Sequence, residues 1–168
     1  VAKEKMANAS CMAGMAFSNA MLGLCHSMAH KLGAKFHIPH GIANALLINE
    51  VIKYNATDAP FKQGTFPQYE TPQAIERYAK AAEYIGLTGR TNEEKVTALI
   101  NKINELKTDI NIPMSISEFG VSEAEFLAAV DQLAVEAFDD QCTPANPRYP
   151  LIDDIKQLYL NAFYGETK

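Results

Sequence analysis

The sequence has 168 residues, of which 48% are hydrophobic and 21% charged, the balance of a globular protein with a substantial core. Its net charge of -5 gives no basic surface for nucleic acid, and no apolar run approaches the ~20 residues of a membrane span. The first residues also lack the order of a signal peptide, so we expect a cytoplasmic protein with neither nucleic-acid nor membrane partners.

The first predicted element is a buried helix from Lys3 to Phe36, or two helices joined near Gly23. This segment is rich in alanine and methionine and carries apolar side chains on nearly every face. Methionine mostly fills gaps in protein cores. We therefore expect core positions, not a ligand-binding surface, for Met6, Met12, Met15, Met21 and Met28.

A break is predicted at residues 37–41, because Pro39 keeps the residue before it out of the helical region and Gly41 permits a sharp turn. A second buried helix is expected over residues 42–54. Residues 57–72 contain three prolines and a glycine, which predicts an extended loop within one domain.

The remaining residues predict four helices, three of them with clear boundary signals. One spans residues 75–85 and ends at Gly86; a second spans 96–110; a third spans 126–138; and the last spans 151–163. Capping boxes precede the second and third of these helices, at Thr91–Glu94 and Ser122–Glu125. No strand pattern, phosphate-binding glycine loop or repeat is present, so the predicted fold is all-α: a single irregular helical bundle over residues 1–168.

All four histidines fall within residues 26–40, at His26, His30, His37 and His40. His26 and His30 are four residues apart in mid-helix, so their rings project from one face. His40 stands just before the next helix, whose dipole disfavours imidazolium and leaves a lone pair for a metal. From spacing alone, both a metal site and ordinary core histidines remain open. No carboxylate lies between Lys5 and Glu50, so a metal held by imidazoles alone would suit zinc.

Two carboxylate pairs, Asp139–Asp140 and Asp153–Asp154, could serve acid–base chemistry. Adjacent side chains on a helix diverge, and acids favour the first turn of a helix. We therefore interpret both pairs as solvated capping residues.

Two segments carry a family resemblance. The run GLCHSMAHKLG at residues 23–33, followed by FHIPHG at 36–41, resembles the signature of the iron-containing alcohol dehydrogenase family. Residues 6–17 and 142–148 are similar to family patterns too, so the resemblance spans most of the chain. It is greatest to the C-terminal alcohol dehydrogenase module of bacterial bifunctional aldehyde/alcohol dehydrogenases. The resemblance implies the C-terminal helical domain of a dehydroquinate synthase-like fold.

Residue by residue, the resemblance implies that His26 and His40 are metal ligands. It implies that His30 is a catalytic residue beside both the substrate and the nicotinamide. Phe17 matches an apolar wall near the nicotinamide, and Cys142 matches a residue that lines the substrate cavity. His37 matches no functional position and is expected to lie exposed in a loop.

The implied cofactors are Fe(II), with zinc possible, and NAD. The implied reaction interconverts acetaldehyde or another short aldehyde with its primary alcohol by hydride transfer between the carbinol carbon and the nicotinamide, with the metal polarising the substrate oxygen. The family's other two ligands, an aspartate and a histidine, and its nucleotide-binding α/β domain are not found in these residues. We therefore expect the isolated chain to be inactive and to need an N-terminal nucleotide-binding part of the same protein, in a homo-oligomer or filament.

Two alternative functions stay open. The first is a stand-alone helical module for metal binding or sensing, in which His26, His30 and His40 form a three-imidazole site. The second is a structural domain that mediates assembly and needs no metal.

Overall fold

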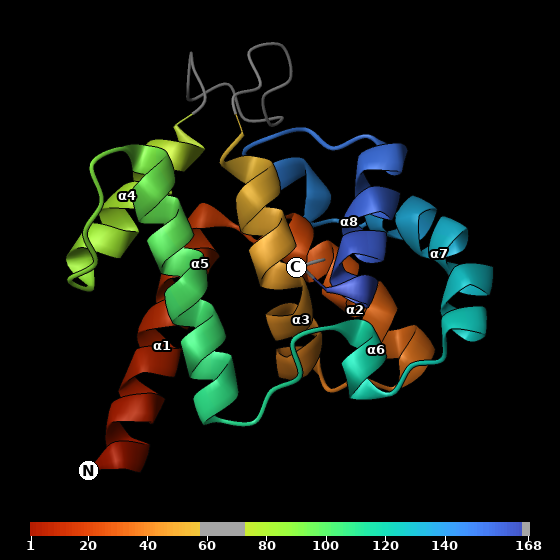
Figure 1. Ribbon diagram of the computed structural model, residues 1–168, viewed down its shortest axis with the longest axis horizontal. Helices are drawn as coiled ribbons and strands as arrows, with labels where there is room; N and C mark the ends of the chain where they lie inside the picture. The colour runs from red at the N-terminus through yellow and green to blue at the C-terminus, as the bar shows by residue number, and fades with distance from the viewer. Residues whose placement is uncertain (58–72, 166–168) are drawn as a thin grey trace.

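The computed structural model describes residues 1–57 and 73–165, and these residues form helices without any β-strand (Figure 1). The elements are α1 (Ala2–Ala20), α2 (Leu24–Phe36), α3 (His40–Asn55), α4 (Ala74–Tyr84), α5 (Asn92–Asp109), α6 (Ile116–Phe119), α7 (Glu123–Phe138), the short 3-10 helix η1 (Thr143–Ala145) and α8 (Ile152–Tyr164). The predicted all-α bundle is confirmed. The loop expected over residues 57–72 lies, after Thr57, outside the described residues.

The centre of the bundle is the pair α2 and α3, with α7 and α8 on one side and the α4–α5 pair on the other (Figure 1). The main core joins α2, α3, α6, α7 and α8 and includes Leu24, Met28, Leu32, Leu47, Phe126 and Tyr159. The Tyr159 hydroxyl donates to the Met28 carbonyl at 2.8 Å, which satisfies the one polar atom of that buried side chain. This core holds α2 against α3 and α7.

The predicted helix starts are confirmed at both capping boxes. The Thr91 hydroxyl accepts from the Glu94 N–H at the start of α5, and the Ser122 hydroxyl accepts from the Glu125 N–H at the start of α7. Two short elements were not predicted, α6 and η1. Their four and three residues are too few to show helical periodicity.

Helix α1 is exposed, and the expectation that it is buried was wrong. No residue of α1 is buried, and no other helix packs extensively along it. Met6, Met12, Met15 and Met21 are 58–70% exposed, so only Met28, in α2, is the core residue we expected. The apolar side chains of α1 are suited to packing against another protein surface, but no such surface is found among the described residues. Within those residues, no helix has both the length and the apolar character to cross a bilayer.

The predicted break between α2 and α3 is confirmed, and it is a tight turn. His37 adopts the left-handed conformation at φ 55°, and the N–H groups of His37 and Ile38 both donate to the Gly33 carbonyl. Ile38 is buried and secures the turn in the core. As a result α3 begins at His40, two residues earlier than expected.

Replacing Gly33 tests this turn. A β-carbon at Gly33 would lie 2.9 Å from the Ile38 carbonyl oxygen, a backbone atom of the turn. We predict that Gly33→Ala lowers the free energy of unfolding by roughly 1–3 kcal/mol, because the turn must shift. Urea unfolding followed by circular dichroism measures the change.

Gly14→Ala is the matched control for Gly33→Ala. At Gly14, within α1, a β-carbon would meet no atom within 4 Å. The same substitution there should not lower the free energy of unfolding, because alanine is favoured over glycine within a helix by roughly 0.5–1 kcal/mol. If Gly33→Ala did not lower it either, the close approach would not constrain the turn.

Candidate functional site

The imidazoles of His26, His30 and His40 lie together and are called the histidine cluster below. Their ring centres are 5.3 Å apart for His26 and His40, 5.5 Å for His30 and His40, and 6.2 Å for His26 and His30. His37 is exposed in the turn, as expected. The fold therefore brings together the three histidines that the resemblance singled out.

Both candidate metal ligands stand at the start of a helix. Helix α2 begins at Leu24, so His26 lies in the first helical turn and not in mid-helix as expected. His40 is the first residue of α3, directly after Pro39. The unpaired N–H groups of a first turn give that end of a helix a partial positive charge.

The surroundings of His26 favour a neutral ring, and those of His40 include a hydrogen-bond donor. Burial, followed by the nearby His40 and His30 rings, lowers the pKa of His26 below its ordinary value. The side-chain nitrogen of Asn44 lies 3.2 Å from Nε2 of His40, and because an amide nitrogen can only donate, it occupies the lone pair of Nε2, so Asn44 must turn away before that nitrogen can bind a metal. The ring of His26 is thus favoured in the neutral state that a metal ligand requires.

The donor set fits a shared cation. Two imidazoles that each place a nitrogen about 2.1 Å from one tetrahedral ion have ring centres roughly 5 Å apart. The 5.3 Å between the rings of His26 and His40 agrees with this geometry. A catalytic metal site takes at least three protein ligands, so these two imidazoles would form part of one.

His30 has a different set of neighbours, on the side of α7. Its Nδ1 lies 3.3 Å from Oδ2 of Asp140, and the same oxygen lies 2.9 Å from the Lys31 ammonium. The other carboxylate oxygen accepts from the Cys142 N–H at 3.0 Å. Burial raises the pKa of Asp140, but the Cys142 N–H, Lys31 and His30 outweigh it and lower that pKa to about 2. Asp140 is therefore ionised at neutral pH.

The interpretation of Asp140 as a solvated capping residue was wrong. Its side chain is 7% exposed, whereas that of Asp139 is exposed as expected. Helix α7 ends at Phe138, so the two acids follow the helix and the divergence of neighbouring helical side chains does not apply to them. One sequence signal could have pointed to Asp140, namely its position two residues before Cys142.

Cys142 lies beside His30 and Asp140. One potential ligand atom from each of the three side chains lies within 4.8 Å of the other two, and within the described part of the chain they are the trio that could hold an ion. The Lys31 ammonium already pairs with Asp140, however, and burial together with Asp140 raises the pKa of the Cys142 thiol. We therefore interpret this trio as a hydrogen-bonded group and not as a second metal site.

Buried hydrogen bonds connect the segment 142–146 to the start of α2 and the end of α3. The hydroxyls of Thr143 and Ser27 hydrogen-bond at 2.8 Å. The Asn146 side-chain oxygen accepts from the Leu24 N–H at 3.2 Å, and its nitrogen donates to Asn55 at 2.7 Å. The residues on either side of His26 thus hold Cys142 in a fixed position relative to the histidine cluster.

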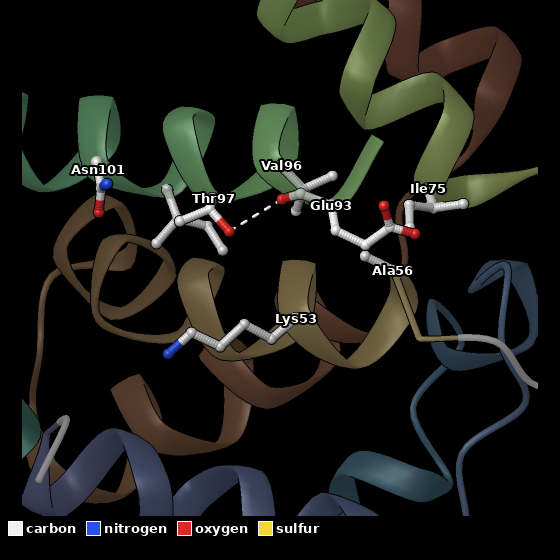
Figure 2. A pocket seen from close by; sticks show the side chains of 8 residues that line it. Lys53, Ala56, Ile75, Glu93, Val96, Thr97 and Asn101 are labelled. Atoms are coloured by element: carbon white, nitrogen blue, oxygen red, sulfur yellow. Dashed lines mark hydrogen bonds between the residues drawn. The ribbon is translucent and has the colours of Figure 1, made fainter. Parts of the chain in front are cut away.

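Two other features lie apart from the cluster. Phe17, in the exposed helix α1, is 45% exposed, and its place beside a nicotinamide stays a prediction. A pocket of about 320 Å³ lies between α3, α4 and α5 (Figure 2). Its lining includes Lys53, Ile75, Glu93, Val96, Thr97 and Ile100, and none of the predicted site residues.

Comparison with known proteins places the chain among dehydrogenases. A family profile described as "Fe-containing alcohol dehydrogenase family, C-terminal" matches residues 1–163. The chain is 56% identical to the bifunctional aldehyde-alcohol dehydrogenase AdhE of Escherichia coli (strain K12), over 98% of this chain and 19% of that protein. It is 60% identical to the aldehyde-alcohol dehydrogenase of Clostridium acetobutylicum, over 96% of this chain and 19% of that protein. The chain therefore spans about a fifth of the length of these relatives.

A solved structure gives the same result. The iron-containing alcohol dehydrogenase from Thermococcus thioreducens superimposes with a TM-score of 0.78 at 33% identity. The match covers 95% of this chain and 36% of that one. The helical fold described above is thus the fold of one part of that larger enzyme.

The ion pairs of Asp140 predict a pH dependence of stability. Its folded pKa of about 2 lies below the ordinary value of 3.8. The ionised carboxylate therefore stabilises the fold above about pH 4, and this contribution is lost as the pH falls toward about 2. We expect the destabilisation caused by Asp140→Ala, measured by urea unfolding, to be full near neutral pH and to shrink below about pH 4. If the difference in unfolding free energy between the native chain and Asp140→Ala does not change with pH, the variant has lost only packing contacts.

The buried Asn146 side chain gives a second prediction. Asn146→Ala leaves the Leu24 N–H and the Asn55 amide without their partner, so we expect a loss of roughly 2–4 kcal/mol in the free energy of unfolding. The control is Asn161→Ala, which removes a surface hydrogen bond to Gln157 and should change stability by about 0.5 kcal/mol or less. Equal effects of the two substitutions would contradict a fastening role for Asn146.

Proposed function

Because the chain belongs to the Fe-containing alcohol dehydrogenase family, of whose enzymes it forms the C-terminal helical part, we propose that it supplies the metal- and substrate-facing side of an NAD-linked alcohol dehydrogenase. The proposed reaction interconverts a primary alcohol and a short aldehyde such as acetaldehyde. His26 and His40 hold the metal, and His30 transfers the proton. Cys142 lines the space for the substrate, and Phe17 faces the nicotinamide.

One observation carries the proposal. The rings of His26 and His40, from the first turns of two different helices, lie 5.3 Å apart, at a separation that suits a common ion. Rings far apart or on opposite faces of the bundle would have excluded a shared cation. The relatives named above support the type of reaction, because their own names describe aldehyde and alcohol dehydrogenases.

The chain's own residues have separate tasks in this chemistry. When bound, a divalent cation supplies Lewis acidity toward the oxygen of the alcohol or aldehyde. His26 and His40 bind as neutral nitrogen donors, which suit Fe(II) and also zinc. The His30 side chain is 35% exposed, so it can take the proton released from the alcohol and pass it to water.

Two imidazoles do not complete a catalytic metal site. The chain also spans only 19% of the length of the two bacterial relatives. We propose that the remaining ligands and the NAD-binding part belong to another part of the same protein, and that the full-length protein is a homo-oligomer. The exposed apolar side chains of α1 are the surface that we expect this other part to cover.

The alternative of a three-imidazole metal module has less support, because the ring centres of its three histidines are 5.3 to 6.2 Å apart, whereas within the described residues the trio whose ligand atoms lie within 4.8 Å of one another is His30, Asp140 and Cys142. A module that binds a metal through His26, His30 and His40 together would need no further ligands. The two functions differ in the role of His30, which is a metal ligand in the module and a proton carrier in the dehydrogenase.

Histidine variants of the full-length protein test the proposal. His26→Ala and His40→Ala should lose the metal and the activity together. His30→Ala should retain the metal and lose turnover by roughly 10²–10⁴-fold, the usual contribution of a general acid–base group. Metal content is measured by mass spectrometry and turnover by NADH formation from ethanol. His37→Ala, which changes an exposed histidine of the same segment, should change neither quantity.

Other results would reject the dehydrogenase role. Tight, stoichiometric metal binding by the isolated chain that His30→Ala weakens as much as His26→Ala does would favour the three-imidazole module. Full activity after replacement of both His26 and His40 would contradict both candidates and leave an assembly domain.

A further inference from the structure

We propose that Asp140 is a positioning residue for His30, whose proton it holds on Nδ1 so that Nε2 is free to accept the proton of the alcohol. The inference rests on the proposed function, because it assumes that His30 transfers that proton. It adds a residue to which the family resemblance assigned no role.

The contact between the two side chains determines the tautomer of His30. Nδ1 of His30 lies 3.3 Å from Oδ2 of Asp140. An ionised carboxylate has acceptors only, so the hydrogen atom between the two groups must be carried by the ring. Neutral His30 therefore has its proton on Nδ1 and its lone pair on Nε2.

The carboxylate of Asp140 is held by groups other than His30. Its Oδ1 accepts from the Cys142 backbone N–H at 3.0 Å, and its Oδ2 pairs with the Lys31 ammonium at 2.9 Å. The side chain is 7% exposed, so water competes little for these bonds. A partner fixed in this way can determine the orientation of the ring that contacts it.

The ring of His30 is also constrained on its face. It stacks on the ring of His40, with ring centres 5.5 Å apart and planes 19° from parallel. Asp140 at the ring edge and His40 against the ring face together restrict its rotation. His30 is thus oriented relative to a proposed metal ligand, as a proton carrier beside a metal-bound substrate must be.

Asp140→Asn is expected to reverse the tautomer of His30. An asparagine side chain has one oxygen and one NH₂ group, and the backbone N–H of Cys142 cannot move away from its acceptor. The Lys31 ammonium, which pairs with Oδ2 in the native chain, is at the end of a flexible side chain and can turn to solvent, so the amide oxygen should face Cys142 and the NH₂ group should face Nδ1 of His30. Because NH₂ can only donate, Nδ1 would become the acceptor and Nε2 would carry the hydrogen.

The experiment compares Asp140→Asn with Asp139→Asn in the full-length protein. We expect Asp140→Asn to lower kcat for alcohol oxidation 10- to 100-fold, the usual effect of losing a group that orients a catalytic histidine. The KM for the alcohol and the metal content should stay within about twofold, because Asp140 touches neither proposed metal ligand directly. Asp139→Asn makes the same chemical change at the exposed neighbour and should leave all three quantities unchanged.

A double-mutant cycle tests whether Asp140 acts through His30. In a His30→Ala background, adding Asp140→Asn should cause no further loss of kcat, because the ring that it orients is absent. A further tenfold loss in that background would overturn the inference, as would a kcat for Asp140→Asn equal to that of Asp139→Asn. Either result would leave the proposed function of His30 intact. If His30→Ala alone keeps full turnover, the proposed function itself fails.

Asp140→Glu provides a second variant that retains the charge. Its carboxylate can still accept from Nδ1 of His30, although from one methylene further away, so its kcat should exceed that of Asp140→Asn. This comparison also serves if the asparagine variant folds poorly, since poor folding lowers the amount of active enzyme and not the kcat per bound metal. A kcat for Asp140→Glu at or below that of the asparagine variant would overturn the inference.

Discussion

The convergence of two helix starts is the constraint on which the candidate site depends. His26 and His40 lie in the first turns of α2 and α3, and the tight turn at His37 and Ile38 sets where the second helix begins. Burial and the neighbouring rings lower the pKa of His26, so this ring keeps a lone pair for a metal. The same geometry that places the rings of His26 and His40 5.3 Å apart thus also favours the neutral form of His26.

A second group of interactions holds the opposite side of the site. Asn146 and Thr143 fasten the segment after α7 to the beginning of α2, and Asp140 joins that segment to His30. Cys142 lies between Asp140 and Thr143, and its backbone N–H donates to the Asp140 carboxylate. A change in the packing of α7 against α2 would therefore alter the position of His30 as well as the stability of the bundle.

Helix α1 shows the difference between an apolar helix and a buried one. Methionine is a residue typical of protein cores, yet the methionines of α1 are 58–70% exposed in the described structure. The membership of the chain in a family of longer enzymes gives this exposure a physical reason, because an apolar surface without a partner in one segment can be covered by another. The remaining metal ligands, which we propose to lie in another part of the same protein, would also have to pack closely against this chain.

Much of the fold and part of the site could be predicted from the sequence, because the signals were local. Helical periodicity, the caps at Thr91 and Ser122, and the histidine spacing all involve residues a few positions apart, and the structure confirms the helices and the caps. The role of Asp140 could not be predicted, because its partner His30 is 110 residues away and no short-range pattern reports such a contact. Only the tertiary structure decided which acid is buried, which methionines are exposed and which rings meet, since each depends on a packing partner distant in the chain.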